Sequence, residues 1–467
     1  MKISIIGGGP CGTFLAYKLS KEGHDIHLYE KENYLGGCWG TKYVDGYFSE
    51  HSPKLFFNNY HNTIKFFEEI GIDFEKEFKK GLSTIKMSLS LVKCLSIKDI
   101  ISLSKAMLLP LNHWKGKTVK DMIRYYDISK NGENELNNIC YLIEGVSIEK
   151  MTTIELLDAF NKGFFYSQFV NKRKTDEFLF NKIENILKHN NVSIYLNTKI
   201  KNIPNLNQIN FETNIETNSF KTNSFDKIIF CIPPKNFVEI LKYSPKILKH
   251  NWGNFKSFYD LCNKSNYSGI SIQYHFDPSL NVKIHWRKLN DPIDDWKIIC
   301  DYKFNCLSCV LTDYTLVSTF LGKSINECSK HDISNEVFRM LKHNGVLDYN
   351  VIYKKYTIEE GTYRTYDTWK TSHDAFFKSK HIIDNINFFG NKDLGVYLVG
   401  TCNINKISPY IPFTSYESAI TSAKLFLNQS NLCSNHFYVY KPFTLKYFLF
   451  FSFFFIALLF IFRFLRF

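Results

Sequence analysis

The sequence predicts an α/β fold whose parallel sheet is assembled from separated parts of the chain. Residues 2–6, KISII, form a short apolar run, and a glycine-rich turn, a helical pattern and a second strand-like run, DIHLYE at 25–30, follow it. This order of strand, helix and strand is typical of a parallel sheet. Two later runs, FDKIIFCIP at 225–233 and GVYLVG at 395–400, are as apolar as buried strands. We therefore expect the sheet to be discontinuous in sequence.

The composition indicates a folded protein without a nucleic-acid or metal site. With 467 residues, 45% of them hydrophobic, the chain is long enough for about two or three domains. Its net charge of +13 is spread along the chain without a basic run, which argues against nucleic-acid binding. The 12 cysteines are scattered, as expected for reduced thiols. Cys306 and Cys309 form one CLSC pair, and no second pair with zinc-like spacing accompanies it.

The first turn carries the spacing of a dinucleotide-binding loop. Gly7, Gly9 and Gly12 form a G-x-G-x-x-G pattern between the first strand and the helix expected over 10–21. The first glycine allows a tight turn, the second lets a diphosphate approach the backbone, and the third lets helix and strand pack closely. Glu30 ends the second strand, where its carboxylate can accept hydrogen bonds from a ribose diol. The opening segment therefore predicts a Rossmann-like unit that binds a dinucleotide.

The next segment resembles the flavin-containing amine oxidase superfamily, which includes protoporphyrinogen oxidases and phytoene desaturases. YLGGCWGT at 34–41 is similar to that family's GG-[basic]-x-x-[ST] segment, with Gly36, Gly37 and Thr41 at the matching positions. The resemblance implies a second backbone contact with the phosphates of FAD. Cys38 stands where the family has an arginine. In DGYFSEHSPKLF, Glu50 and Pro53 match a stretch near the flavin, and Ser52 replaces a glycine.

Three further stretches extend the resemblance. VSIYLNTKIKNI at 192–203 is similar to the strand whose backbone reaches the adenine end of FAD, near Ile200, and 226–233 resembles a strand that ends at a proline. GVYLVG followed by SYESAITSA resembles the closing motif, in which Gly400 and Glu417 match and Ser418 replaces a glycine. The resemblance implies that the positive end of the last helix faces the flavin pyrimidine edge.

The resemblance implies a Rossmann-like FAD-binding domain with a mixed sheet, built from residues 1–60, 185–240 and 385–430. Residues 61–184 and 241–384 are then insertions, the first mostly helical and the second an α+β substrate domain. The polar stretch after residue 203 is expected to form short strands with turns.

The predicted function is that of an FAD-dependent oxidoreductase of the amine-oxidase type. Hydride transfer would run from a C–H bond, beside an amine or along an unsaturated chain, to flavin N5. Two alternatives stay open: a flavin-dependent mutase resembling UDP-galactopyranose mutase, and a non-enzymatic flavoprotein that acts as a membrane-bound structural or interaction protein. The substrate and the catalytic residues are not assigned. The residues weighed for the substrate site are Tyr363, Tyr366, Trp369, Lys283 and Lys288.

The C-terminus predicts a membrane anchor over residues 445–467. YFLFFSFFFIALLFIF at 447–462 contains no charged residue, and Arg463 and Arg466 follow it. With the arginines reaching toward the interface, the span approaches about 20 residues, the length of a transmembrane helix. No secretory signal precedes the first strand. We expect a single-pass C-terminal anchor with the body of the protein in the cytosol.

Overall fold

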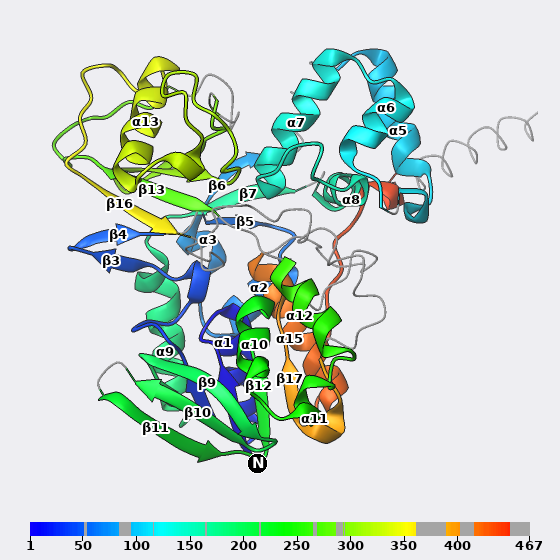
Figure 1. Ribbon diagram of the computed structural model, residues 1–467, viewed down its shortest axis with the longest axis vertical. Helices are drawn as coiled ribbons and strands as arrows, with labels where there is room; N and C mark the ends of the chain where they lie inside the picture. The colour runs from blue at the N-terminus through cyan, green and yellow to red at the C-terminus, as the bar shows by residue number, and fades with distance from the viewer. Residues whose placement is uncertain are drawn as a thin grey trace, which may run out of the picture.

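The structure is a computed structural model of the chain (Figure 1). It describes residues 1–50, 54–83, 95–114, 116–163, 166–213, 216–264, 269–285, 293, 295–360, 389–401 and 415–448. The lower half in Figure 1 holds the parallel sheet and the N-terminus, and two lobes lie above it.

A five-stranded parallel sheet forms the centre of the lower half. Its strands, in spatial order, are β17 (Val396–Leu398), β12 (Lys227–Phe230), β1 (Lys2–Ile6), β2 (Asp25–Tyr29) and β8 (Ser193–Tyr195). Every pairing is parallel, so the predicted mixed sheet is wrong for this layer. The antiparallel strands form a separate sheet, β9 (Thr198–Asn205), β10 (Gln208–Thr213) and β11 (Glu216–Ser224), where short strands were expected.

Helices cover the parallel sheet because its strands are apolar on both faces. Helix α1 (Pro10–Lys21) packs against α15 (Tyr416–Ser430) and α9 (Asn181–His189) in one core. Helices α10 (Pro234–Lys242), α11 (Lys246–Lys249) and α12 (Phe255–Lys264) enclose a second core. The sheet is therefore buried, and the residues that follow its strands lie together at their carboxyl ends.

The left lobe in Figure 1 is an antiparallel sheet that packs on helix α13 (Lys330–His343). Its strand order is β14 (Ile299–Lys303), β15 (Cys306–Leu311), β13 (Ile270–His275) and β16 (Lys355–Glu360). Alternate residues point to opposite faces, and the apolar face packs on α13. Cys306 and Cys309 lie three positions apart on β15 and thus face opposite sides of this sheet. Cys309 instead lies 3.5 Å, Sγ to Sγ, from Cys300 on β14.

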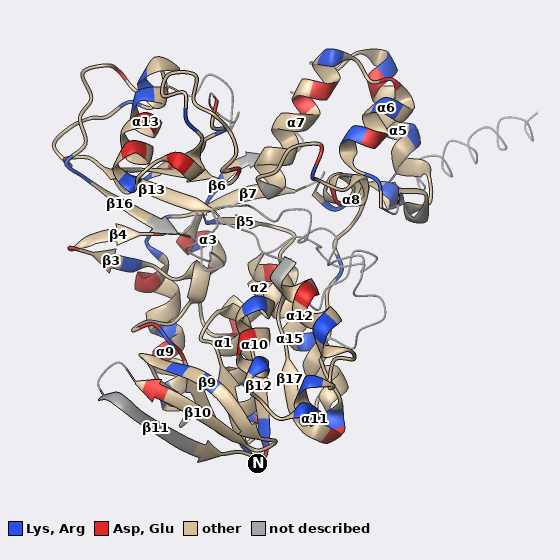
Figure 2. Ribbon diagram, viewed as in Figure 1, with Lys and Arg blue, Asp and Glu red and all other residues tan. Residues whose placement is uncertain are grey.

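The right lobe is helical and has its own core. It contains α5 (Ile97–Leu108), α6 (Val119–Tyr126), α7 (Lys130–Glu144) and α8 (Thr153–Gly163). Ser96 with Asp99, and Thr118 with Asp121, form capping boxes that fix where α5 and α6 begin. Basic and acidic segments are interspersed on these helices (Figure 2), in keeping with a charge that is spread rather than concentrated.

Short elements join the lower half to the lobes. They are β3 (Lys42–Val44), β4 (Tyr47–Ser49), β5 (Leu55–Phe57), α2 (His61–Glu69), α3 (Phe74–Glu77), β6 (Phe78–Ser83) and β7 (Ser167–Asn171). Strand β4 contacts β16 of the left lobe. Residues 42–50 thus run from the parallel sheet to the antiparallel one.

The described chain ends on the body of the protein. Tyr440 is hydrogen-bonded to Asn62 on α2, and the Lys446 amide donates to Asn161 on α8 over 2.9 Å. Within the described ranges, no helix has both the length and the apolar character needed to cross a bilayer. Residues 449–467 of the predicted anchor lie outside those ranges.

Candidate functional site

The glycine turn after β1 packs tightly on one side and is open on the other. Gly7 has φ +107°, and a Cβ there would lie 2.6 Å from the Cys231 carbonyl oxygen. At Gly12 a Cβ would lie 1.9 Å from the Gly7 oxygen, so helix and turn touch through backbone alone. At Gly9, the residue before α1, a Cβ would meet no atom of the described chain within 4 Å. The predicted roles of the three glycines therefore fit this geometry: two serve packing, and the middle one borders open space.

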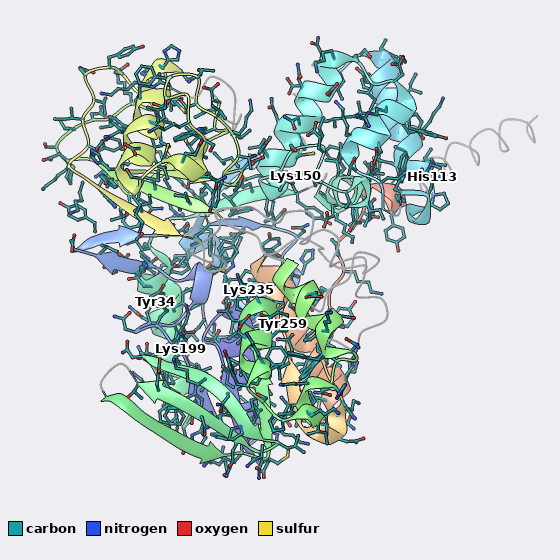
Figure 3. All side chains as sticks on the ribbon, in the orientation of Figure 1. Tyr34, His113, Lys150, Lys199, Lys235 and Tyr259 are labelled. Atoms are coloured by element: carbon teal, nitrogen blue, oxygen red, sulfur yellow. The ribbon has the colours of Figure 1, made fainter. Side chains whose placement is uncertain are left out.

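The second glycine segment lies directly on the first. The Gly36 amide donates to the Gly8 oxygen over 2.8 Å. Gly36 and Gly37 have φ +120° and +55°, and a Cβ on Gly37 would lie 3.3 Å from the Gly9 Cα. The ring of Tyr34, labelled in Figure 3, packs on Gly40 at the end of this segment. Both glycine segments thus border the open space at Gly9.

Glu30 lies beside the turn, as predicted. Its two carboxylate oxygens accept the amides of Gly8 (2.7 Å) and Glu32 (3.0 Å). Burial raises the pKa of Glu30, and these two amides oppose the shift. Each oxygen keeps a lone pair that a ribose hydroxyl can use. Ile200 lies nearby on β9. The Thr198 amide of that strand donates to the backbone carbonyl oxygen of Glu30 over 2.8 Å, and the Ile200 side chain is buried in the second core.

Gly400 follows β17 at the same edge of the sheet. The preceding carbonyl, that of Val399, lies 3.5 Å from the thiol of Cys11 in the first turn of α1. Glu30 follows β2 and Gly400 follows β17, so three strand spacings separate them, about 14 Å in all. Gly7 follows β1, between the two. The structure therefore brings Gly400, the glycine turn and Glu30 to one edge.

The start of α15 is capped by its own side chains. Ser415 and Ser418 bond each other's amides over 2.9 and 3.0 Å, so the serine that replaces the family's glycine completes a capping box. The Glu417 carboxylate points toward α2. It accepts the amides and side chains of Asn62 and Thr63 over 2.7–3.0 Å. A cofactor contact by Glu417 would thus come from its backbone, and that role stays a prediction.

Thr41 links the second glycine segment to the left lobe. Its hydroxyl lies 3.0 Å from that of Thr175 and 3.5 Å from Glu50 Oε1. Glu50 Oε2 forms an ion pair with Lys303 on β14 at 2.9 Å, although its alignment is not that of a hydrogen bond. Both side chains are buried. This pair links residues 42–50 to the antiparallel sheet.

The face of the antiparallel sheet opposite α13 is polar. It carries Ser271, Gln273 and His275 from β13, Cys306 and Ser308 from β15, Asp301 and Lys303 from β14, and Thr357 from β16. Gln273 accepts from Ser49 and Thr357 (3.1 and 3.0 Å) and donates to the Glu50 carbonyl (2.7 Å). Among the described residues, Ser308 Oγ and Asp301 Oδ2 are buried without a hydrogen-bond partner. We name these eight residues the polar face.

Burial controls protonation on the polar face. It lowers the pKa of His275 to about 4, with Lys174 adding to the effect, so the imidazole is neutral at pH 7. Burial also raises the pKa of Asp301, against the opposing charge of Lys303. At the sheet edge, burial lowers the pKa of Lys235 in the first turn of α10 (Figure 3).

Sequence reasoning missed most of the polar face. The alternation in SGISIQYHF, with serine, glutamine and histidine on one side of the strand, was the available signal. Lys283 is exposed in the structure. Tyr363, Tyr366, Trp369, Lys288, Ser52 and Pro53 lie outside the described residues. Within the described part of the chain no group of three metal-ligating side chains is found.

Comparisons with known proteins agree with this geometry. A family described as NAD(P)-binding Rossmann-like domain matches residues 5–70. Over 55 residues the chain is 34% identical to 4,4'-diapophytoene desaturase of Staphylococcus aureus, covering 12% of this chain and 11% of that protein. Over 73 residues it is 34% identical to zeta-carotene desaturase of Synechocystis, covering 15% of each. The chain thus matches less than a sixth of the length of these relatives.

Solved structures extend the similarity to the whole fold. A reduced UDP-galactopyranose mutase superposes with a TM-score of 0.62 at 11% identity, covering 93% of this chain and 96% of that one. Putrescine oxidase bound to putrescine gives 0.56 at 12% identity, covering 91% and 97%. An oxidoreductase from Methanosarcina mazei gives 0.55 at 12% identity, covering 91% and 100%. The resemblance predicted from the sequence is therefore confirmed: the chain carries a Rossmann-like nucleotide-binding domain within the fold that amine oxidases and UDP-galactopyranose mutase share.

Proposed function

We propose that the protein is an FAD-dependent oxidoreductase of the amine-oxidase type. The observation that carries the proposal is the open space at Gly9, bordered by both glycine segments and flanked by Glu30 and Gly400 at one sheet edge. A side chain at Gly9 would fill this space, so the residues present fit a diphosphate. An extended dinucleotide suits an edge where its adenosine end meets Glu30 and its other end meets Gly400 and α15.

The cofactor-binding residues predicted from the sequence would hold FAD along the carboxyl ends of the strands. Gly9 would present its backbone to the diphosphate, while Gly7 and Gly12 keep the turn tight. Gly36, Gly37 and Thr41 would line the second side of the diphosphate, and Glu30 and the backbone near Ile200 would receive the adenosine. Gly400 and the backbone at Glu417 border the flavin end. Bound FAD supplies a ring that accepts a hydride at N5.

The polar face supports an amine over an apolar unsaturated chain as the substrate class. Ser308 Oγ and Asp301 Oδ2, which are buried without a hydrogen-bond partner among the described residues, would stay unpaired against a hydrocarbon, at a cost of about 1–3 kcal/mol each. A neutral His275 and the Glu50–Lys303 pair would instead orient a polar group and keep bulk water out. The substrate itself remains unassigned.

The test is reduction of the flavin in the purified full-length chain. The preparation should be yellow and release FAD on denaturation, and a panel of primary and secondary amines should bleach the flavin in anaerobic stopped-flow experiments. A colourless, folded protein that takes up no added FAD would refute the proposal. Turnover of a nucleotide sugar with no amine oxidation would favour the mutase alternative, and stable FAD that no substrate reduces would favour the non-enzymatic one.

The predicted anchor belongs to the same proposal. The run from Tyr447 to Phe462 contains no charged residue, and Phe443 to Lys446 leave the body beside α8, where Tyr166 bonds the Phe443 oxygen over 2.8 Å. A segment that starts on the surface of one lobe can enter a bilayer without disturbing the sheet edge at Gly9. We propose a single-pass C-terminal anchor with a cytosolic body.

A further inference from the structure

Helix α5 in the right lobe exposes a row of large apolar side chains. Ile97, Ile101 and Leu108 keep 78%, 49% and 64% of their surface in contact with solvent. Their spacing of four and seven residues places all three within about 40° of each other around the helix axis. Single exposed apolar side chains are normal, but a row of them on one helix face is typical of a binding surface. We name these three residues the α5 stripe.

The α5 stripe does not serve the packing of its own lobe. Leu103 and Ala106, on the opposite side of α5, are buried in the core of the right lobe. The capping box of Ser96 and Asp99 fixes the start of the helix. The helix is thus held by its inner side, and burial of the α5 stripe would need a surface from outside the lobe.

Lysines border the α5 stripe. Lys98 and Lys105 lie seven residues apart, so both flank the stripe on the same side of the helix. Lys98 is paired with the exposed Asp127 over 2.6 Å, and Lys105 is exposed. Asp99, the one acidic residue in the sequence of α5, is buried at the helix start. An apolar row bordered by lysines is the pattern of a helix that lies on an anionic bilayer.

The segment that leads to the predicted anchor lies on the same lobe. The Lys446 amide donates to Asn161 on α8, and α8 also packs on α5. Figure 1 shows this segment, in red, beside α8. Tyr447, the first residue of the uncharged run, is more than half exposed. A bilayer that held the run would therefore lie next to the right lobe, and the anchor would keep the α5 stripe at a high local concentration near lipid.

We propose that the α5 stripe docks on an anionic phospholipid bilayer, the same one that holds the predicted anchor. The proposal rests on that anchor, which belongs to the proposed function. The three apolar side chains enter the boundary between headgroups and acyl chains, and Lys105 lies at the level of the phosphates. Three side chains alone bind a bilayer weakly and reversibly, so the anchor supplies the attachment and the stripe sets how the lobe is oriented on the membrane.

The test measures how deep α5 lies in vesicles that carry the full-length chain. Ile101→Trp reports from the stripe, and Ile352→Trp is the matched control, because Ile352 is an isoleucine of the left lobe that is also exposed. The vesicles contain phosphatidylserine and dibrominated phosphatidylcholine, whose bromine atoms quench tryptophan on contact, and the wild type gives the background of the native tryptophans. We expect the added tryptophan to be quenched at least about twofold more strongly at residue 101 than at residue 352.

Sedimentation of the same vesicles separates this proposal from the anchor. A chain that sediments but shows equal quenching at residues 101 and 352 would overturn the docking of α5 and keep the anchor, whereas a chain that does not sediment would overturn both. Vesicles without phosphatidylserine should quench Ile101→Trp less, and equal quenching would contradict an anionic partner. FAD titration of the same samples reports on the flavin function separately.

A second copy of the chain is the alternative occupant of the α5 stripe. Adding Leu108→Asp to Ile101→Trp should lower the quenching toward that of the control, because a carboxylate then faces the lipid. Leu108 is exposed, so this change should leave the melting temperature unaltered. Wild-type dimers in mild detergent that Leu108→Asp dissociates, together with no quenching at residue 101, would assign the stripe to a second copy and overturn the proposal.

Discussion

At the scale of single residues, different glycines of the turn serve packing and binding. Gly9 and Gly12 belong to one motif, yet a Cβ at Gly12 would collide with the Gly7 oxygen at 1.9 Å and a Cβ at Gly9 would meet no described atom within 4 Å. Gly9 also has φ −73°, which any residue adopts. The two positions therefore form a matched pair of tests.

We predict that Gly9→Ala folds with wild-type stability and loses at least tenfold in FAD affinity, because its methyl group takes the place of the diphosphate. Gly12→Ala should instead lower the melting temperature of the apoprotein and prevent FAD binding as a consequence. Thermal unfolding of the apoprotein and flavin titration measure the two effects. Gly163→Ala, a helical glycine with open space around it, is the control. Equal FAD affinity in Gly9→Ala and wild type would contradict the diphosphate site.

His275 makes a second prediction at this scale. Its pKa is about 4 in the folded protein against 6.5 for the free side chain, because burial penalises the imidazolium. A base with a lowered pKa leaves stability unaffected above pH 6.5 and costs stability as the pH falls toward 4, by up to about 3 kcal/mol. His275→Gln should therefore flatten the fall in unfolding free energy between pH 6.5 and 4. If the free energy of unfolding fell equally with pH in the two proteins over this range, the lowered pKa of His275 would be refuted.

At the scale of elements, the sequence predicts where strands and helices occur better than it predicts which of them pair or pack together. The opening strand, turn and helix are local, and the glycine spacing identifies them. The polar face depends on pairings between β13, β15 and β16 that lie far apart in sequence, so the alternation in SGISIQYHF indicates only the β13 part of it. The antiparallel strands were expected within one mixed sheet, but the polar stretch after residue 203 turns back on itself instead.

Glu417 shows an element fixed by a buried charge. Its carboxylate accepts four hydrogen bonds from the start of α2 and lies deep in the interface with α15. We predict that Glu417→Gln lowers the free energy of unfolding by about 3 kcal/mol, because the amide nitrogen would face donors of Thr63 or Asn62. Urea unfolding measures the change. Glu22→Gln should have a much smaller effect, because this partly exposed carboxylate accepts the Ser434 amide at the surface. Similar losses of unfolding free energy in the two variants would contradict a larger contribution from the buried Glu417 carboxylate at the α15–α2 contact.

At the scale of the whole molecule, helices from near the start and near the end of the described chain pack in one unit. Helix α1 near the start packs on α15 near the end, and the segment after α15 crosses α2 before it reaches α8. Asn62 holds this crossing, since its side chain bonds the Tyr440 amide and oxygen over 3.0 and 3.1 Å and Lys424 Nζ over 3.1 Å. Residues 437–448 are thus part of the folded body, although they follow α15.

This arrangement predicts different results for two truncations. A chain ending at Phe448 should keep its FAD affinity and stability but move from the membrane to the supernatant fraction, because only the apolar run is lost. A chain ending at His436 should also lose stability, because Asn62 and Lys424 lose their partners on Tyr438 and Tyr440 and remain buried. Cell fractionation and thermal unfolding separate the two outcomes. If the chain ending at Phe448 still pelleted with membranes after a high-salt wash, the anchor would have to lie in the body rather than in its tail.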